Sequence, residues 1–220
     1  MFKDKFDKLY IIHCSNNHKR YDFIKNWTSK YGIQDKVDIW WTCKKRINNY
    51  CGKRIGSLLC EFYDNILDRT PNIYGGVFDC AMQHFSIIKT AYERGLNSIM
   101  ILEDDFGFSE DIKKIKNVFN NLPKDWDIIK FDTFFEIGWY TEEGEYFREC
   151  YDDDMKFGAM CYGLNRKGME AVINSYEEVF RGADSALYEA LKDKKVKAYV
   201  ANYRIGRLGI FDSDIDENKK

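Results

Sequence analysis

Short apolar runs alternate with amphipathic segments along the whole chain. Apolar runs of four to eight residues are typical of buried strands, and apolar side chains spaced by three and four residues are typical of helices. The runs cover residues 9–14, 37–42, 99–102, 126–132, 157–164 and 198–201. The helical pattern covers residues 20–30, 77–94, 109–121, 166–176 and 184–192. This alternation predicts an α/β fold with a mostly parallel central sheet flanked by helices.

The apolar run at residues 99–102 is followed by three consecutive acids, Glu103, Asp104 and Asp105. In open α/β sheets, ligands bind at the carboxyl ends of the strands. Three adjacent carboxylates repel one another, so a cation is expected beside them. Oxygen ligands favour Mg²⁺ or Mn²⁺ shared with substrate phosphates. The same pattern also fits a charged turn after a core strand.

Length and charge limit the classes of protein that remain. A chain of 220 residues suits one domain, which we expect to span residues 1–211 before an acidic tail at 212–220. The net charge of -2 gives no basic footprint for nucleic acid. Aromatic residues make up 16% of the chain, more than a core alone requires, and they offer stacking faces for a nucleobase or a sugar.

The cysteines and the N-terminus bear on the compartment. The seven cysteines include no C-x-x-C pair, which argues against a zinc site and for reduced thiols. The first residues are charged throughout, unlike a signal peptide, and no apolar run approaches membrane-spanning length. We therefore expect a cytoplasmic protein with no membrane span. Two polar segments, the basic residues 43–56 and the acidic residues 152–154, are interpreted as solvated loops.

The ordered motifs resemble glycosyltransferase family 25, the group of lipooligosaccharide and collagen galactosyltransferases. They are a first strand followed by an arginine (Tyr10–His13, Arg20), Gly-x-x-x-Cys-x-x-x-His (Gly76–His84), Glu-Asp-Asp (Glu103–Asp105), Pro-x-x-Trp-Asp (Pro123–Asp127), Gly-x-x-x-Tyr with Lys-Gly (Gly158–Tyr162, Lys167–Gly168) and a late acid (Asp184). Three positions depart from the family: His13-Cys14 replaces Asn-Leu, Gln83 replaces Ser, and a late proline is missing near Gly206.

The resemblance implies a GT-A fold and a metal-dependent, inverting transfer of galactose or glucose from a UDP-sugar to a glycan or hydroxylated acceptor, as in polysaccharide biosynthesis. Mn²⁺ or Mg²⁺ would neutralise the leaving diphosphate. Two other classes stay open. A Mg²⁺-dependent phosphatase or nucleotidyltransferase also uses acids after a strand, and a non-catalytic module could keep the same fold. A phosphatase of the aspartyl-phosphate type needs an Asp after the first strand, where this chain has His13-Cys14-Ser15.

The resemblance also predicts roles for the acids. Asp105 and Glu103 project from the same side of the chain and are predicted as metal ligands, with Glu103 also facing the donor. Asp104 points the other way, toward the support of the sheet, and is counted with the donor-binding residues. Asp184 is predicted as the catalytic base, because it lies in the acceptor half of the domain; its alternative role is a helix N-cap.

The nucleotide is expected at the end of the first strand. His13, Cys14 and Asn16 are predicted to line the base and ribose, with Arg20 nearby. Arg20 fits an ordinary helix-surface residue equally well. His84 is placed beside the donor by the resemblance alone, and its alternative is a core histidine.

Overall fold

The computed structural model describes residues 4–14, 18–42, 75–108, 111–131, 145–150, 158–178, 182–192, 196–203 and 205–207. The two loops predicted at residues 43–56 and 152–154, and the tail at 212–220, lie outside the described residues.

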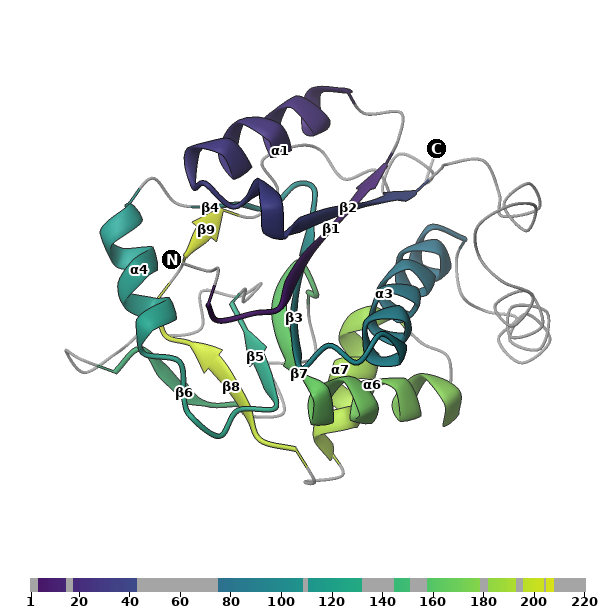
Figure 1. Cartoon of the computed structure of the whole chain (residues 1–220). Coiled ribbons are helices and arrows are strands. Elements are labelled where there is room, and N and C mark those ends of the chain that lie inside the picture. Colours follow the sequence, from purple (N-terminus) through teal and green to yellow (C-terminus); the bar gives the residue numbers. More distant parts are fainter. Residues whose placement is uncertain are drawn as a thin grey trace.

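A central sheet runs through the molecule (Figure 1). Within the described residues it has seven strands in the order β2-β1-β3-β7-β5-β8-β6. Their bounds are β1 Lys8–Cys14, β2 Val37–Thr42, β3 Ser98–Glu103, β5 Ile128–Lys130, β6 Phe147–Glu149, β7 Cys161–Asn165 and β8 Ala198–Ala201. The pairings make five of these strands run in one direction, while β7 and β6 are antiparallel to their neighbours. The predicted α/β class with a mostly parallel sheet is therefore confirmed.

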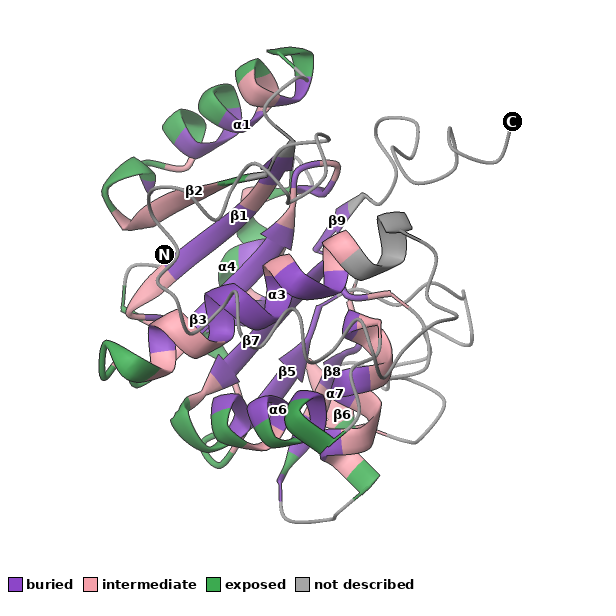
Figure 2. Cartoon of the chain, turned by 90° about the vertical axis from the view of Figure 1, so that its right-hand side faces the viewer, coloured by how far each residue is buried: buried purple, intermediate pink, exposed green. Residues whose placement is uncertain are grey.

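Helices cover both faces of the sheet. Their bounds are α1 His18–Lys30, α3 Gly75–Glu93, α4 Ile112–Asn120, α6 Arg166–Glu178 and α7 Ala183–Lys192. Figure 1 shows α3, α6 and α7 together on one side of the sheet, away from α1 and α4. Figure 2 shows β1, β3 and β7 buried along their length, with exposed residues on the outer sides of the helices.

Alternation along the strands produces two cores, as the period of two requires. In β3, Ile99 and Ile101 belong to the core under α3, α6 and α7, whereas Met100 and Leu102 belong to the core under α1 and α4. Because Glu103 and Asp104 continue this alternation, they leave the strand toward opposite faces of the sheet.

Three short strands were not predicted. They are the edge strand β6, and β4 (Gly107–Phe108) and β9 (Gly206–Arg207), which pair with each other in a separate two-stranded sheet. None of them carries an apolar run, because each has only two or three residues.

Helices α1, α3, α4 and α7 each start one to three residues away from the predicted position. Helix α4 begins at Ile112, and the side chain of Asp111 caps it by accepting the Lys114 N–H at 2.9 Å. Helix α7 begins at Ala183, so Asp184 lies inside the first turn rather than at the N-cap. The N-cap role of Asp184 is therefore wrong. Its Oδ1 instead accepts the N–H of the adjacent Ser185 at 2.8 Å.

Two of the sequence motifs meet at the end of the sheet opposite the acids. Asp127 Oδ2 accepts hydrogen bonds from Lys167 Nζ at 3.0 Å and from the Lys197 backbone N–H at 2.8 Å. Gly168 packs so closely on the strand that a Cβ there would lie 2.1 Å from the Asp127 carbonyl oxygen. Trp-Asp and Lys-Gly therefore join β5 to α6, which is a structural role.

Candidate functional site

The three acids form a turn at the carboxyl end of β3. The Phe106 N–H donates to the Glu103 carbonyl at 3.1 Å, which closes a turn with Asp104 and Asp105 at its centre. The turn lies between the ends of β1 and β7, the two neighbours of β3. It can therefore present the three carboxylates to different surroundings.

Asp104 is buried on the α1 side of the sheet. Its Oδ2 accepts a hydrogen bond from His13 Nδ1 at 2.7 Å, and its Oδ1 pairs with Arg20. Only 5% of the surface of each of Asp104 and Arg20 is exposed, so Arg20 is not a helix-surface residue. The other ring nitrogen of His13, Nε2, is buried and has no hydrogen-bond partner among the described residues.

Aromatic rings extend this side of the site toward solvent. The His13 ring stacks on Tyr21, with centroids 5.7 Å apart and planes at 23°, and the Trp41 ring lies 5.1 Å from His13. Trp41 is 47% exposed, and it is the one large hydrophobic side chain exposed within the described residues. Its register partner on β1 is His13, so it also lies at the carboxyl ends of the strands.

Glu103 faces the opposite side, toward α3. Its Oε1 lies 3.4 Å from His84 Nε2 and 3.8 Å from Cys80 Sγ. His84 is fully buried, and its Nδ1 lies 2.8 Å from the hydroxyl of Tyr162 on β7. The two rings also stack, with planes at 20°. His84 is therefore a buried histidine whose Nε2 faces Glu103.

The carboxyl group of Asp105 is partly buried at the centre of the turn. Its Oδ1 is buried without a hydrogen-bond partner among the described residues. Burial, followed by the charge of Glu103, raises the pKa of Asp105 to about 6, and Arg20 offsets part of that rise. A carboxylate left in this condition gains from a cation beside it.

Asp184 belongs to the same region, although it comes from α7. The pKa of the Cys80 thiol is raised well above its usual value, first by burial and then by the charges of Glu103 and Asp184. Burial, Cys80 and Asp184 likewise raise the pKa of Tyr176 on α6. Asp184 therefore lies near Cys80, which itself contacts Glu103.

The predicted site residues thus divide into two neighbouring groups. His13, Arg20 and Asp104 form one group, and His84 and Glu103 form the other, with Asp105 and Asp184 beside the second. Asn16 and the side chain of Cys14 lie outside what the structure describes.

Sequence reasoning did not assign site roles to Cys80, Trp41, Tyr21 and Tyr162. The spacing of four residues between Cys80 and His84, which puts them on one helix face, was the signal for Cys80. Trp41, at the end of an apolar strand, carries no comparable signal.

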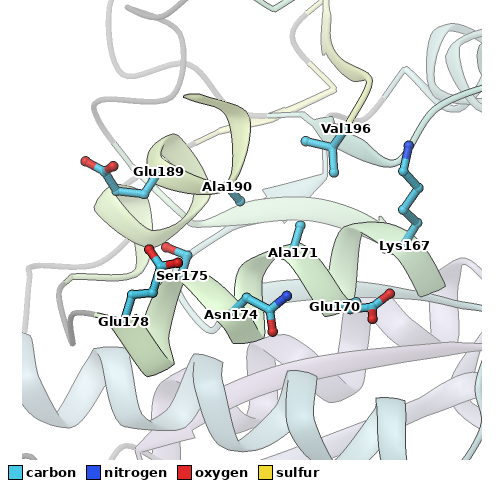
Figure 3. Close-up of a pocket in the computed structure, with 9 residues that line it drawn as sticks. All are labelled: Lys167, Glu170, Ala171, Asn174, Ser175, Glu178, Glu189, Ala190 and Val196. Atoms are coloured by element: carbon cyan, nitrogen blue, oxygen red, sulfur yellow. The ribbon is translucent and has the colours of Figure 1, made fainter. Parts of the chain in front are cut away.

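A polar groove lies elsewhere, between α6 and α7 (Figure 3). Glu170, Asn174 and Glu178 follow one another along α6, with Glu189 of α7 near the Glu178 end and Lys167 at the other end. None of the residues found to line it is a predicted site residue. The groove is therefore separate from the site at Glu103–Asp105.

Among the described residues, no helix is both long and apolar enough to cross a bilayer.

Comparison with known proteins defines the class. The family model of glycosyltransferase family 25 (LPS biosynthesis protein) matches residues 6–186. This span covers most of the chain, so the protein belongs to glycosyltransferase family 25, as its motifs predicted. It is a glycosyltransferase by family. No curated protein matches the sequence significantly.

Three solved structures are similar over most of the chain. They are A197 from STIV (12% identity, 88% of this chain and 81% of that chain, TM-score 0.40), a glycosyltransferase involved in glycosylation of the major capsid of PBCV-1 (10%, 88% and 81%, 0.46) and mouse xyloside xylosyltransferase 1 (8%, 86% and 82%, 0.37). Because all three TM-scores lie below 0.5, the assignment rests on the family match.

Proposed function

We propose that the protein transfers a hexose, galactose or glucose, from a UDP-sugar to a hydroxyl of a glycan or another hydroxylated acceptor, with inversion and with Mn²⁺ or Mg²⁺. One observation carries the proposal. The Oδ1 of Asp105, which is buried and has no hydrogen-bond partner within the described part of the chain, lies at a strand end beside Glu103. A further carboxylate, Asp184, comes from α7. Family membership supplies the reaction class.

The donor set fits a hard divalent ion in part. Asp105 and Glu103, two residues apart, offer oxygen ligands, and Asp105 Oδ1 accepts no hydrogen bond from the described residues. Asp104 does not fit, since both of its oxygens are held by His13 and Arg20. We therefore assign the ion to Asp105 and Glu103. When bound, it would neutralise charge on the leaving diphosphate.

The nucleotide is assigned to the group around Asp104. The exposed face of Trp41 offers a stacking surface for uracil, and the His13 ring lies beside it, 5.1 Å away. Arg20 and Asp104 hold His13 in place, so they act as positioning residues and their contact with the donor is indirect.

The transfer itself needs a base. The acceptor oxygen attacks the anomeric carbon on the face opposite UDP, the new C–O bond forms, and the sugar–phosphate bond breaks with its electron pair leaving on UDP. Asp184 takes the proton of the acceptor hydroxyl. It comes from α7, outside the turn that would hold the ion, which suits a group acting from the other side of the sugar.

The test is a product analysis with UDP-galactose and UDP-glucose in the presence of Mn²⁺. Slow hydrolysis by a glycosyltransferase releases UDP and free hexose, whereas a phosphohydrolase releases UMP and hexose phosphate. Asp105→Ala should abolish the metal-dependent release of UDP while leaving the melting temperature close to that of the unchanged protein. Asp111→Asn, in which the acid lies at the start of α4, is the control. Near-normal turnover by Asp105→Ala would overturn the assignment of the ion.

A further inference from the structure

Three side chains that could each bind a metal ion through a different kind of atom lie close together on the α3 side of the candidate site. Cys80 and His84 are one helical turn apart on α3, and Glu103 ends β3. One donor atom from each, a sulfur, a ring nitrogen and a carboxylate oxygen, lies within 4.8 Å of the other two. We propose that Cys80, His84 and Glu103 bind a thiophilic divalent ion such as Zn²⁺ or Co²⁺.

The two distances from Glu103 match the edges of a tetrahedral site, and the third, between Cys80 and His84, is at most 4.8 Å. Ligands that lie 2.0–2.3 Å from a tetrahedral ion are about 3.3–3.8 Å from one another. Glu103 Oε1 lies 3.4 Å from His84 Nε2 and 3.8 Å from Cys80 Sγ. The three donors therefore need little movement to close on one ion, and three protein ligands leave a fourth position open.

A supporting residue for the histidine is already present. A metal-bound histidine is oriented by a partner on its other ring nitrogen, and here the Tyr162 hydroxyl lies 2.8 Å from Nδ1. With an ion on Nε2, the ring carries its proton on Nδ1 and donates it to the Tyr162 oxygen. The stacked Tyr162 ring fixes the imidazole plane.

The ligand chemistry separates this site from the one assigned to the donor. Asp105 and Glu103 offer only oxygen, which suits Mg²⁺ or Mn²⁺, whereas a thiolate and an imidazole select Zn²⁺ or Co²⁺. The proposal does not rest on the proposed function, because binding of the ion requires neither a UDP-sugar nor turnover. Glu103 is common to both sites, so a thiophilic ion should compete with Mn²⁺ for it.

The test is a spectroscopic titration of the full-length protein with Co²⁺ in metal-free, oxygen-free buffer. We expect one equivalent to bind and to produce the thiolate-to-cobalt charge-transfer band, which Zn²⁺ then abolishes by displacement. Cys80→Ser should lose the band, and Tyr162→Phe should weaken binding by about 10–100-fold. The matched control, Cys150→Ser, changes another half-buried thiol and should keep the band.

A second measurement covers the case in which Cys80→Ser does not fold. In the unchanged protein, one equivalent of Zn²⁺ should protect Cys80 from alkylation, as located by peptide mass spectrometry, and should leave the labelling of Cys150 unaltered. Absence of the band, its survival in a folded Cys80→Ser variant, or unprotected Cys80 would each overturn the proposal. None of these results depends on whether UDP-sugars are turned over.

Discussion

Single residues that depart from the family pattern have contacts of their own in this chain. His13 replaces the usual Asn, and its ring both donates to Asp104 and stacks on Tyr21. Gln83 replaces the usual Ser, and its Oε1 accepts the indole N–H of Trp40 at 2.8 Å, which ties α3 to β2. These substitutions change the residues that pack around the carboxyl edge of the sheet, whereas the acids Glu103–Asp105 are the same as in the family.

Replacing Asp184 by Asn should separate catalysis from helix stability. An amide oxygen can still accept the Ser185 N–H, but it cannot take a proton from a hydroxyl as a carboxylate does. We expect kcat to fall by about 100-fold or more with little change in melting temperature. Glu189→Gln, on the same helix, is the control and should turn over normally. Wild-type kcat in Asp184→Asn would direct the search to Asp132, Glu136 or Asp79.

Arg20 is expected to matter for stability because of its burial. Truncation to Ala removes the guanidinium that pairs with the buried Asp104 carboxylate, next to the His13 contact. Removing one member of a buried ion pair costs about 3–5 kcal/mol, which equilibrium urea unfolding would measure. The neighbouring exposed residue provides the control, Lys19→Ala, with almost no change. Equal stability of the two variants would contradict the buried pair.

At the scale of elements, the motif residues join strands to helices. Burial alone would raise the pKa of Asp127, but hydrogen bonds from the Lys197 N–H, Lys167 and Asn165 outweigh it and lower that pKa. The carboxylate thus connects the start of β5 to α6 and to the segment before β8. The alternation of apolar residues indicates the strands, but these connections set how they are joined.

The pH dependence of stability should reveal this junction. The folded pKa of Asp127 lies below its unfolded value of about 4. Its contribution to the free energy of unfolding is therefore complete above the unfolded pKa and is lost as the pH falls through the folded pKa. Asp127→Asn should therefore lose about 1–3 kcal/mol at neutral pH, with a difference that shrinks in acid. Urea unfolding at several pH values tests this. The exposed Asp125→Asn should change little, and an equal, pH-independent loss in both variants would argue against the junction.

At the scale of the whole molecule, β3 divides the carboxyl edge of the sheet, where the candidate site lies, into two halves. Glu103 leaves the strand toward α3, and Asp104 leaves it toward α1, so consecutive residues serve opposite faces of the sheet. In the proposed function, the half on the α1 side holds the uracil and ribose of the donor. The half on the α3 side holds the diphosphate, the sugar and the catalytic base, Asp184.

The nucleotide half can be tested at its edge. Trp41→Ala removes the exposed ring, and a stacked base is worth about 1–3 kcal/mol, so the UDP dissociation constant in calorimetry should rise accordingly. Stability should hardly change, since 47% of Trp41 is already exposed. Trp41→Phe keeps an aromatic face and should recover most of the affinity. If UDP binds Trp41→Ala as tightly as the unchanged protein, uracil does not stack there.

Much of the fold could be predicted because its signals are local. The spacing of apolar residues located the main strands and helices, because it reflects which side of each element is buried. The acids at the end of β3 were found in the same way. The family motifs added Asp184 and His84, which no periodicity identifies.

The sequence by itself determined the elements and the strand end that carries the acids, because burial acts on neighbouring residues. Only the tertiary structure decided that β7 runs against β3 and β5, where Gly163 packs on the ring of Phe6. It also decided which acid meets which partner: Asp104 meets His13 and Arg20, and Glu103 meets His84 and Cys80. Those contacts join residues up to 91 positions apart, and their free energy depends on packing that no local pattern records.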